Sequence, residues 1–518
     1  MKWMHKEISV PDKRDSLLTS KALHSFLVLY LGLIFLWRAF AYPSLLGDDA
    51  EQVLFAQSGF LFGYHLPNPI LPTWLVIISE HIFGINAASV VLVKFIFFGV
   101  IFFFQERLAR VVLKNETAII AATLSPLAIY YFAWDSVRTY THSIMLLAAM
   151  LATVYVFYKI TETKRLIWYA VFGVVIGLGL LAKYNYALFL LCFVAAALFE
   201  SSYRRSLGNW AVVLSVLVAL VIAGPHGLWL LDQRHLMGDV TVQKFQIQSE
   251  ISWLLRSWLG MRAWGEAVIS FVLPLAALLV LFFPKAFVLK QRDATDVAKP
   301  SGRLGRLMER YLLIVLVVTA GMVLASGTTR VRIHYMFLLF LLPLWAFYRI
   351  EAANYTDRAL KRYIYSVLSL AMIVPVALVI TFVTEPRFNK WAPLNLPYAE
   401  IAHQLRSAGF IEGTVYAHNY PYFIAGDLRL QFPNSRFLSV LYPQYMPPAH
   451  DRQGQCLVIW NSDGGVKESS VVPYAEKIFN LDSESGERGS IKVPYTNGDG
   501  RMASFSYRLW PAGSGTCR

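Results

Sequence analysis

Three acidic residues, Asp48, Asp49 and Glu51, follow an apolar run in a chain that is otherwise basic and hydrophobic. Ionisable groups close to a bilayer cost free energy unless they are solvated or paired, so such a cluster is a candidate functional site. Apolar residues recur at helical spacing after Asp48, and the proline-rich segment 67–69 breaks this pattern before residues 70–83 become apolar again. The pattern favours two short helices along a membrane surface, with the acids at the start of the first. The alternative is a loop whose acids only keep it in water.

The composition is that of a polytopic membrane protein: the 518 residues are 56% hydrophobic and only 15% charged. A spanning helix needs about 20 mostly apolar residues. About eleven runs approach that length, and we expect eleven to thirteen transmembrane helices. The runs are 23–40, 89–105, 117–132, 141–158, 166–181, 186–199, 210–231, 266–284, 311–325, 335–348 and 363–383. The first run has no small-residue cleavage site behind it, so we expect an uncleaved span instead of a signal peptide.

Lysine and arginine residues predict the orientation. They concentrate in the N-terminal tail and in alternate loops such as 285–310, and the positive-inside rule makes these sides cytoplasmic. Residues 41–69 contain no lysine or arginine, so the acidic loop is expected to face the compartment opposite the cytoplasm. The net charge of +14 is then mainly an orientation signal with affinity for anionic membrane lipids, and nucleic-acid binding is not favoured.

The predicted fold class is a polytopic α-helical membrane protein with a C-terminal periplasmic α/β domain. We assign residues 1–384 to the membrane domain, with the acidic first non-cytoplasmic loop at 41–88 as the candidate functional site. Residues 385–518 change character, because short strand-like runs alternate with glycine and proline. On an oxidising face Cys456 and Cys517 can pair, whereas Cys192 lies in a span and is expected to be an inert packing residue.

The loops on the acidic side collect polar and ionisable residues. Each has an ordinary structural interpretation as a local ion pair, a bend or a snorkelling side chain. Together they fit a pocket for a phosphorylated, lipid-borne substrate, with cations for a phosphate and a carboxylate for a proton. The candidates are Asp135, Arg138, His142, Lys183, Tyr184, Asn185, His226, Arg330, Arg332 and His334.

The order of these features resembles the membrane glycosyltransferases of the C-type (GT-C) fold. The matching motifs are Asp48-Asp-Ala-Glu-Gln, Pro67-Asn-Pro-Ile, Gly-Leu-Gly-Leu-Leu-Ala-Lys183, Gly-Pro-His226 and Arg332-Ile-His-Tyr. Within this fold the chain is most similar to the branch that contains the lipopolysaccharide core and lipid A galacturonosyltransferases and the lipid A aminoarabinose transferase. The match runs through most of the chain, including the C-terminal segment.

The resemblance implies an inverting transfer of a sugar, galacturonic acid or a related one, from polyprenyl phosphate to lipid A or lipopolysaccharide core. The reaction would occur at the periplasmic face of a bacterial inner membrane, in a monomer. The resemblance makes Asp48 the base, Asp49 its acidic neighbour and Lys183 a ligand of the donor phosphate; Glu51 and Asn68 complete the expected substrate site. No cofactor is required, although the paired carboxylates would also suit a divalent cation.

Two alternatives stay open. One is a protein O-mannosyltransferase-like enzyme with a protein acceptor, and the other is a transporter or flippase of lipid-linked sugars. Inverted repeats with broken helices in both halves would favour a transporter, and the sequence shows no such symmetry. Where the aminoarabinose enzyme has Glu-Lys, this chain has Pro67-Asn68, so one acid and one cation are missing and aminoarabinose is not favoured as the sugar.

Overall fold

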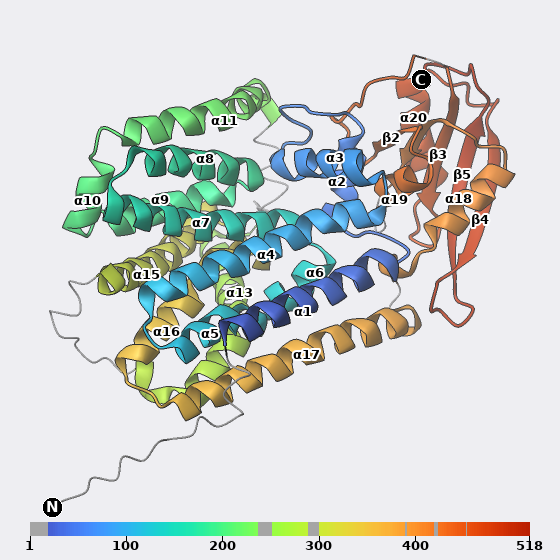
Figure 1. Cartoon of the computed structure of the whole chain (residues 1–518). Helices are drawn as coiled ribbons and strands as arrows, with labels where there is room; N and C mark the ends of the chain where they lie inside the picture. Colours follow the sequence, from blue (N-terminus) through green and yellow to red (C-terminus); the bar gives the residue numbers. More distant parts are fainter. Residues whose placement is uncertain are drawn as a thin grey trace, which may run out of the picture.

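The computed structural model describes residues 19–236, 251–287, 300–388, 391–418, 423–451 and 453–517. Long helices run side by side in a bundle, and a β-sheet domain covers one end of it (Figure 1). The helices of the bundle are α1 (Ser20–Phe40), α4 (Ala87–Val112), α5 (Glu116–Leu124), α7 (Thr141–Thr163), α8 (Leu166–Ala182), α9 (Asn185–Ala197), α10 (Ser201–Leu207), α11 (Val212–Asp232), α13 (Trp253–Phe282), α15 (Pro300–Ser326), α16 (Leu342–Ala352) and α17 (Asp357–Phe388). The predicted helical membrane fold is confirmed.

Fewer helices than predicted are full-length spans. Among the described residues eight helices are long and apolar enough to cross a membrane, or nine if the pair Glu116–Ala128 and Tyr131–Arg138, bent by 70°, forms one span. Every predicted apolar run coincides with a helix, but α8 and α9 have only 17 and 13 residues. Length criteria applied to the sequence could not anticipate the bend, which falls where a 3-10 turn at Ser125–Ala128 meets a π-helical turn at Tyr131–Asp135.

Burial distinguishes the central helix from the peripheral ones. In α7, 72% of the apolar window is buried, whereas the corresponding value for α11 is 17%. The apolar side chains of α11 that other helices leave uncovered, such as Val221 and Leu228, are of the kind that faces lipid. The start of α7 is therefore held rigidly by its neighbours, which matters because the pocket described below includes residues at that end.

The C-terminal segment forms a five-stranded sheet in the order β2-β1-β3-β5-β4. Its strands are β1 (Gly413–Ala417), β2 (Arg436–Ser439), β3 (Gln455–Asn461), β4 (Glu487–Pro494) and β5 (Met502–Trp510), and its helices are α18 (Tyr398–Ser407), α19 (Ile424–Gln431) and α20 (Val472–Phe479). β1 pairs in parallel with β2 and β3, and β5 is antiparallel to both β3 and β4. Cys456 of β3 forms a disulfide with Cys517, which confirms that predicted pair.

Two short helices, α2 (Asp48–Ala56) and α3 (Leu71–Phe83), lie between the bundle and the sheet domain (Figure 1). Gly426 of α19 packs so closely on α2 that a Cβ atom there would lie 2.1 Å from the carbonyl oxygen of Ala50. The Arg429 guanidinium donates to both carboxylate oxygens of Glu80, at 2.7 and 2.9 Å, and to the carbonyl oxygen of Val53 at 2.7 Å. The sheet domain therefore fixes the helix that carries the three acids.

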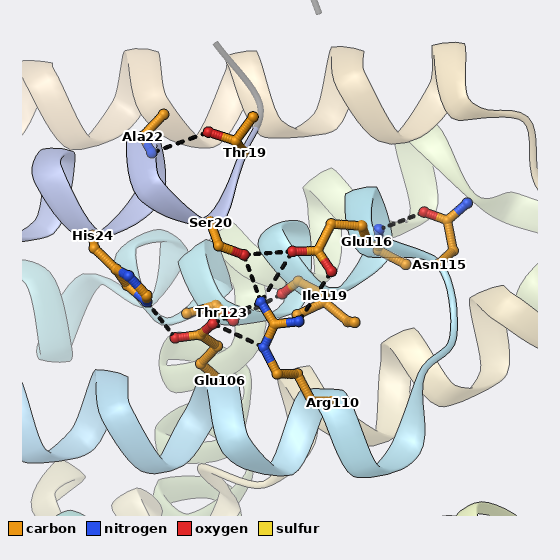
Figure 2. A network of polar contacts seen from close by, with 11 residues as sticks. Thr19, Ser20, Ala22, His24, Glu106, Arg110, Asn115, Glu116, Ile119 and Thr123 are labelled. Carbon is orange, nitrogen blue, oxygen red and sulfur yellow. Dashed lines mark hydrogen bonds and ion pairs between the residues drawn. The ribbon is translucent and has the colours of Figure 1, made fainter. Parts of the chain in front are cut away.

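A polar network joins α1, α4 and α5 at the end of the bundle that lies away from the sheet domain (Figure 1, Figure 2). Arg110 donates to Glu106 at 2.9 Å, to Glu116 at 3.0 Å and to Ser20 Oγ at 2.6 Å. His24 Nε2 lies 2.7 Å from the carboxylate of Glu106. Each group of this network has its partners within the network, so we interpret it as a structural clamp between helices.

Candidate active site

Most of the site residues predicted from the sequence line one pocket of about 540 Å³. It lies where α2 meets the turn at 65–68, the start of α7, the α8–α9 connection and the segment 330–335. Ten predicted residues line it: Asp48, Glu51, Asn68, His142, Lys183, Tyr184, Asn185, Arg330, Arg332 and His334. They meet because these helix starts and connections lie at the same end of the bundle.

Asp48 is the first residue of α2 and presents its carboxylate to this pocket. Gly47 precedes it with φ +54°, and a Cβ atom at Gly47 would lie 2.3 Å from Thr139 Oγ1, so this tight entry requires glycine. The backbone N–H of His142 donates to Asp48 Oδ2 at 3.2 Å. Within the described part of the chain, Asp48 Oδ1 has no hydrogen-bond partner. The start of a helix also favours a negative charge.

Asp49 points away from the pocket, because successive residues on a helix are about 100° apart. Its Oδ2 accepts from Lys94 Nζ at 2.8 Å and lies 3.7 Å from Arg38 Nη2, and its Oδ1 accepts from Thr141 Oγ1 at 2.5 Å. The side chains of Asp49, Lys94 and Arg38 are all 0% exposed. Both oxygens are thus engaged inside the protein, so the expected pairing of Asp49 with Asp48 in the pocket is not what the structure shows.

A second buried acid lies near this cluster. The backbone N–H of Leu45 donates to Asp427 Oδ1 at 2.7 Å, and Oδ2 has no hydrogen-bond partner in the described structure. Burial raises the pKa of Asp427 well above its usual value, against the opposing effects of the Leu45 hydrogen bond and the Arg38 charge. Burial therefore favours the protonated form of Asp427, and Asp49 is the acid that contacts Lys94 and Arg38 directly.

Glu51 connects the pocket to the sheet domain. It accepts hydrogen bonds from the hydroxyl of Tyr442 and from Asn68 Nδ2, the latter at 3.2 Å. Burial, together with the charge of Glu51, raises the pKa of Tyr442 well above its usual value, so the phenol stays neutral and donates. The Tyr442 ring also packs against His65, with 4.7 Å between ring centroids. Residues of the sheet domain thus support this wall of the pocket.

His142 is held by a chain of hydrogen bonds. Thr73 Oγ1 donates to Gln52 Oε1 at 2.5 Å, and Gln52 Nε2 lies 2.9 Å from His142 Nε2. His142 Nδ1 lies 3.2 Å from the carbonyl oxygen of Ala182. A neutral imidazole with its proton on Nδ1 satisfies every contact of this chain. The arrangement fixes the backbone N–H of His142 that binds Asp48.

Lys183 and Tyr184 lie in the connection between α8 and α9. Lys183 Nζ donates to the buried Ser143 Oγ at 2.6 Å. The Tyr184 hydroxyl lies 3.1 Å from His226 Nε2, and His226 Nδ1 lies 2.7 Å from the carbonyl oxygen of Phe62. His226 therefore contacts the hydroxyl of Tyr184 and does not itself line the pocket.

Arg330 and Arg332 lie in the segment between α15 and the 3-10 helix Ile333–Leu339. Both are exposed, and both line the pocket. In the described part of the chain the guanidinium groups of these two residues form no ion pair and no hydrogen bond. Two arginines without an acidic partner in one pocket are a suitable site for an anionic ligand.

Two more predicted site residues lie outside the pocket lining. Arg138 pairs with Glu385 at 3.4 Å, and Asp135 lies one turn before Arg138. Conversely, His65, Tyr140 and Tyr335 line the pocket but were not predicted. Their only sequence signal is their place in connections on the acidic side, because neither an aromatic ring nor a lone histidine there is distinctive.

The fold and the site together define a class of protein. The structure of ArnT from Cupriavidus metallidurans bound to undecaprenyl phosphate is similar to the present one with a TM-score of 0.58 and 11% sequence identity, covering 94% of this chain and 98% of that chain. The family described as dolichyl-phosphate-mannose-protein mannosyltransferase matches residues 67–229. The chain is a membrane glycosyltransferase of the GT-C type.

Its curated relatives include two proteins of Rhizobium johnstonii. The chain is 29% identical over 492 residues to the lipopolysaccharide core galacturonosyltransferase RgtB, covering 94% of this chain and 96% of RgtB. It is 28% identical over 485 residues to the lipopolysaccharide core galacturonosyltransferase RgtA, covering 92% of this chain and 94% of RgtA. With its apolar helices, this relationship makes the chain a multi-pass inner-membrane protein.

Proposed function

We propose that the protein is an inverting glycosyltransferase that moves galacturonic acid, or a related sugar, from polyprenyl phosphate to lipid A or lipopolysaccharide core. The observation that carries this proposal is the pocket itself, in which Asp48 with an open oxygen shares one cavity with Arg330 and Arg332, neither of which meets a carboxylate among the described residues. The names of RgtA and RgtB support the sugar and the acceptor, and the undecaprenyl phosphate bound to ArnT supports the lipid carrier.

In the proposed reaction the acceptor hydroxyl oxygen attacks the anomeric carbon of the donor sugar while Asp48 takes the hydroxyl proton. The bond between the anomeric carbon and the phosphate oxygen breaks, and its electron pair leaves with the polyprenyl phosphate. Attack from the side opposite the leaving group inverts the anomeric carbon. Negative charge grows on the phosphate during this step, so Lys183, Arg330 and Arg332 stabilise the transition state.

The charge of the pocket suits an acidic sugar. A uronic acid on a phosphate carries two anionic groups, whereas a neutral sugar on a phosphate carries one. The pocket offers three basic side chains, Lys183, Arg330 and Arg332, against the carboxylates of Asp48 and Glu51. Three basic side chains against two carboxylates leave positive charge in excess for the donor.

We propose that the reaction needs no divalent cation. A metal shared by Asp48 and Asp49 would require both carboxylates to face one point, but Asp49 is directed to Lys94, Arg38 and Thr141. The lysine and arginine side chains of the pocket supply the positive charge that a metal would otherwise bring. We further propose that the protein acts as a monomer, with the pocket and the sheet domain in the periplasm and the N-terminus in the cytoplasm.

The direct test is reconstitution. Purified protein would be incubated with polyprenyl-phosphate galacturonic acid and lipid A or core lipopolysaccharide, and the products analysed by mass spectrometry. The proposal predicts that the acceptor gains one uronic acid and that polyprenyl phosphate is released in equal amount. Movement of intact donor across a proteoliposome bilayer without bond cleavage would support a transporter, and sugar found only on protein would support a protein acceptor.

A further inference from the structure

A second polar pocket, of about 380 Å³, lies at the other end of α2 from Asp48. We call it the interfacial pocket. Its polar lining residues come from the end of α2, from α3 and from the sheet domain: Gln57, Glu80, His81, Arg429, Ser435, Arg436 and His450. The candidate active-site pocket around Asp48 includes none of these residues.

Arg436 carries an unbalanced charge into the interfacial pocket. Its Nε and Nη2 donate to the carbonyl oxygen of Pro447 at 3.0 and 2.7 Å. No carboxylate contacts its guanidinium anywhere in the described ranges. Burial lowers the pKa of Arg436 from its usual value, and the opposing effect comes from Tyr445. A half-buried arginine that meets only a neutral oxygen keeps Nη1 free for an anion.

The other charged side chains of this pocket do not compensate Arg436. Glu80 is the single acid among the described residues of the lining, and it is paired with Arg429 through two hydrogen bonds. Arg429 Nε is buried and has no hydrogen-bond partner in the described structure. His81 Nδ1 lies 2.7 Å from the carbonyl oxygen of Ile77, which leaves Nε2 of this imidazole for a ligand. The lining is therefore cationic overall.

The pocket adjoins an apolar surface. On α3, Ile78, Ile82 and Phe83 are 46, 66 and 57% exposed, next to the pocket residue His81. In a membrane protein such a row of large apolar side chains is expected to face lipid. An anion that enters here would thus be the headgroup of a lipid whose chains lie along α3.

The two pockets are close enough for one substrate. At about 1.5 Å per residue along α2, Asp48 and Gln57 are about 13 Å apart. Resting on the function proposed above, we propose that the interfacial pocket is an acceptor subsite, in which Arg436 binds an acidic group, phosphate or carboxylate, of the glycolipid acceptor. The hydroxyl that receives the sugar would then lie at Asp48.

The test compares Arg436→Gln with Arg488→Gln, a matched change of an exposed arginine in the same domain. The probes are bisphosphorylated lipid A and its dephosphorylated form, titrated against protein in nanodiscs of neutral lipid. Loss of one charge-assisted hydrogen bond should weaken binding of bisphosphorylated lipid A about tenfold or more in Arg436→Gln, with no change in Arg488→Gln. The dephosphorylated lipid should bind all three proteins alike. In steady-state assays the KM for acceptor should rise, while kcat and the KM for donor stay constant.

Equal binding of bisphosphorylated lipid A by wild type and Arg436→Gln would overturn the subsite. So would competition by inorganic phosphate or phosphatidylglycerol at the same concentrations as lipid A, because the pocket would then bind any anion. The binding assay needs no turnover. If no variant transfers sugar but the binding difference persists, the proposed function fails while the lipid site stands.

Discussion

Asp48 and Asp49 are neighbours in the sequence, yet their carboxylates point to different sides of α2. Asp48 Oδ2 accepts from the backbone N–H of His142 at 3.2 Å and faces the candidate active-site pocket, whereas Asp49 Oδ2 accepts from Lys94 Nζ at 2.8 Å inside the protein. The division gives the two acids separate tasks in our account. Asp48 takes the acceptor proton, and Asp49 anchors the helix that presents Asp48.

Asp49→Asn should damage stability. The change leaves Lys94 and Arg38 as buried cations without a carboxylate, and breaking a buried pair in this way typically costs about 3–5 kcal/mol. Unfolding of the detergent-solubilised protein would measure the loss. The double variant Asp49→Asn/Lys94→Met, which removes one cation as well, should recover part of it. An Asp49→Asn protein as stable as wild type would contradict this role.

Asp427→Asn, in contrast, should gain stability relative to wild type as the pH rises. The pKa of Asp427 is raised in the folded protein, so the folded state binds the proton more tightly than the unfolded state does. Such a group stabilises the fold fully only below the unfolded pKa of about 3.9, and this contribution is lost as the pH rises towards the folded pKa. The amide keeps an oxygen for the Leu45 N–H and does not ionise. The unfolding temperature of the variant should therefore rise relative to that of wild type as the pH increases above about 4. If the unfolding temperatures of both proteins change in parallel with pH, the prediction is wrong.

Arg332→Ala should weaken donor binding. A charge-assisted hydrogen bond to a phosphate is worth about 1.5–3 kcal/mol, so the dissociation constant for polyprenyl-phosphate sugar should rise about tenfold to a hundredfold. Lys183→Ala should act in the same direction and also slow turnover, because a cation on the phosphate acts before and during bond cleavage. Arg358→Ala, a change of an exposed arginine at the start of α17, is the control. Unchanged donor affinity in both pocket variants would show that the donor phosphate does not bind at Arg332 and Lys183.

The proposed orientation can be tested with single cysteines. In a Cys192→Ser background, where the disulfide occupies the other two cysteines, Ser485→Cys adds an exposed thiol in the sheet domain. Thr163→Cys adds one at the exposed end of α7, on the far side of the bundle. An impermeant thiol reagent applied to spheroplasts should label Ser485→Cys, and should label Thr163→Cys only after permeabilisation. The reverse pattern would invert the topology and move the pocket to the cytoplasm.

Local properties of the sequence predicted much of the fold. Each apolar run lies in helical structure, in one helix or in a broken one, because the length and composition of a run are local properties. The pocket was predictable for a related reason: Asp48, His142, Lys183 and Arg332 lie at helix ends that the alternation of loops places on one side. The bend after Ser125–Ala128 was not predictable, since it depends on how neighbouring helices pack against this segment.

Long-range partners set the limit of sequence reasoning at the site. Asp48 and Asp49 look equivalent in the sequence, and only the fold shows that Lys94 faces Asp49. Lys94 did carry a signal, as a lysine inside an apolar run, because such residues are expensive unless paired. Tyr442 and Arg429 carried none, since they reach α2 and α3 from a domain more than 300 residues away in sequence.

The central claim is that the carboxylate of Asp48 accepts the proton of the acceptor hydroxyl. Asp48→Asn preserves the side-chain shape and an oxygen for the His142 N–H, so the variant should fold and bind donor normally. Loss of a general base typically costs about 10²–10⁴ in rate. The decisive measurement is the initial rate of transfer from lipid-linked sugar by Asp48→Asn, beside Asp451→Asn as an exposed control on the sheet domain. Our account predicts a fall of about two to four orders of magnitude for Asp48→Asn alone; a folded Asp48→Asn protein that transfers sugar at the wild-type rate would contradict it.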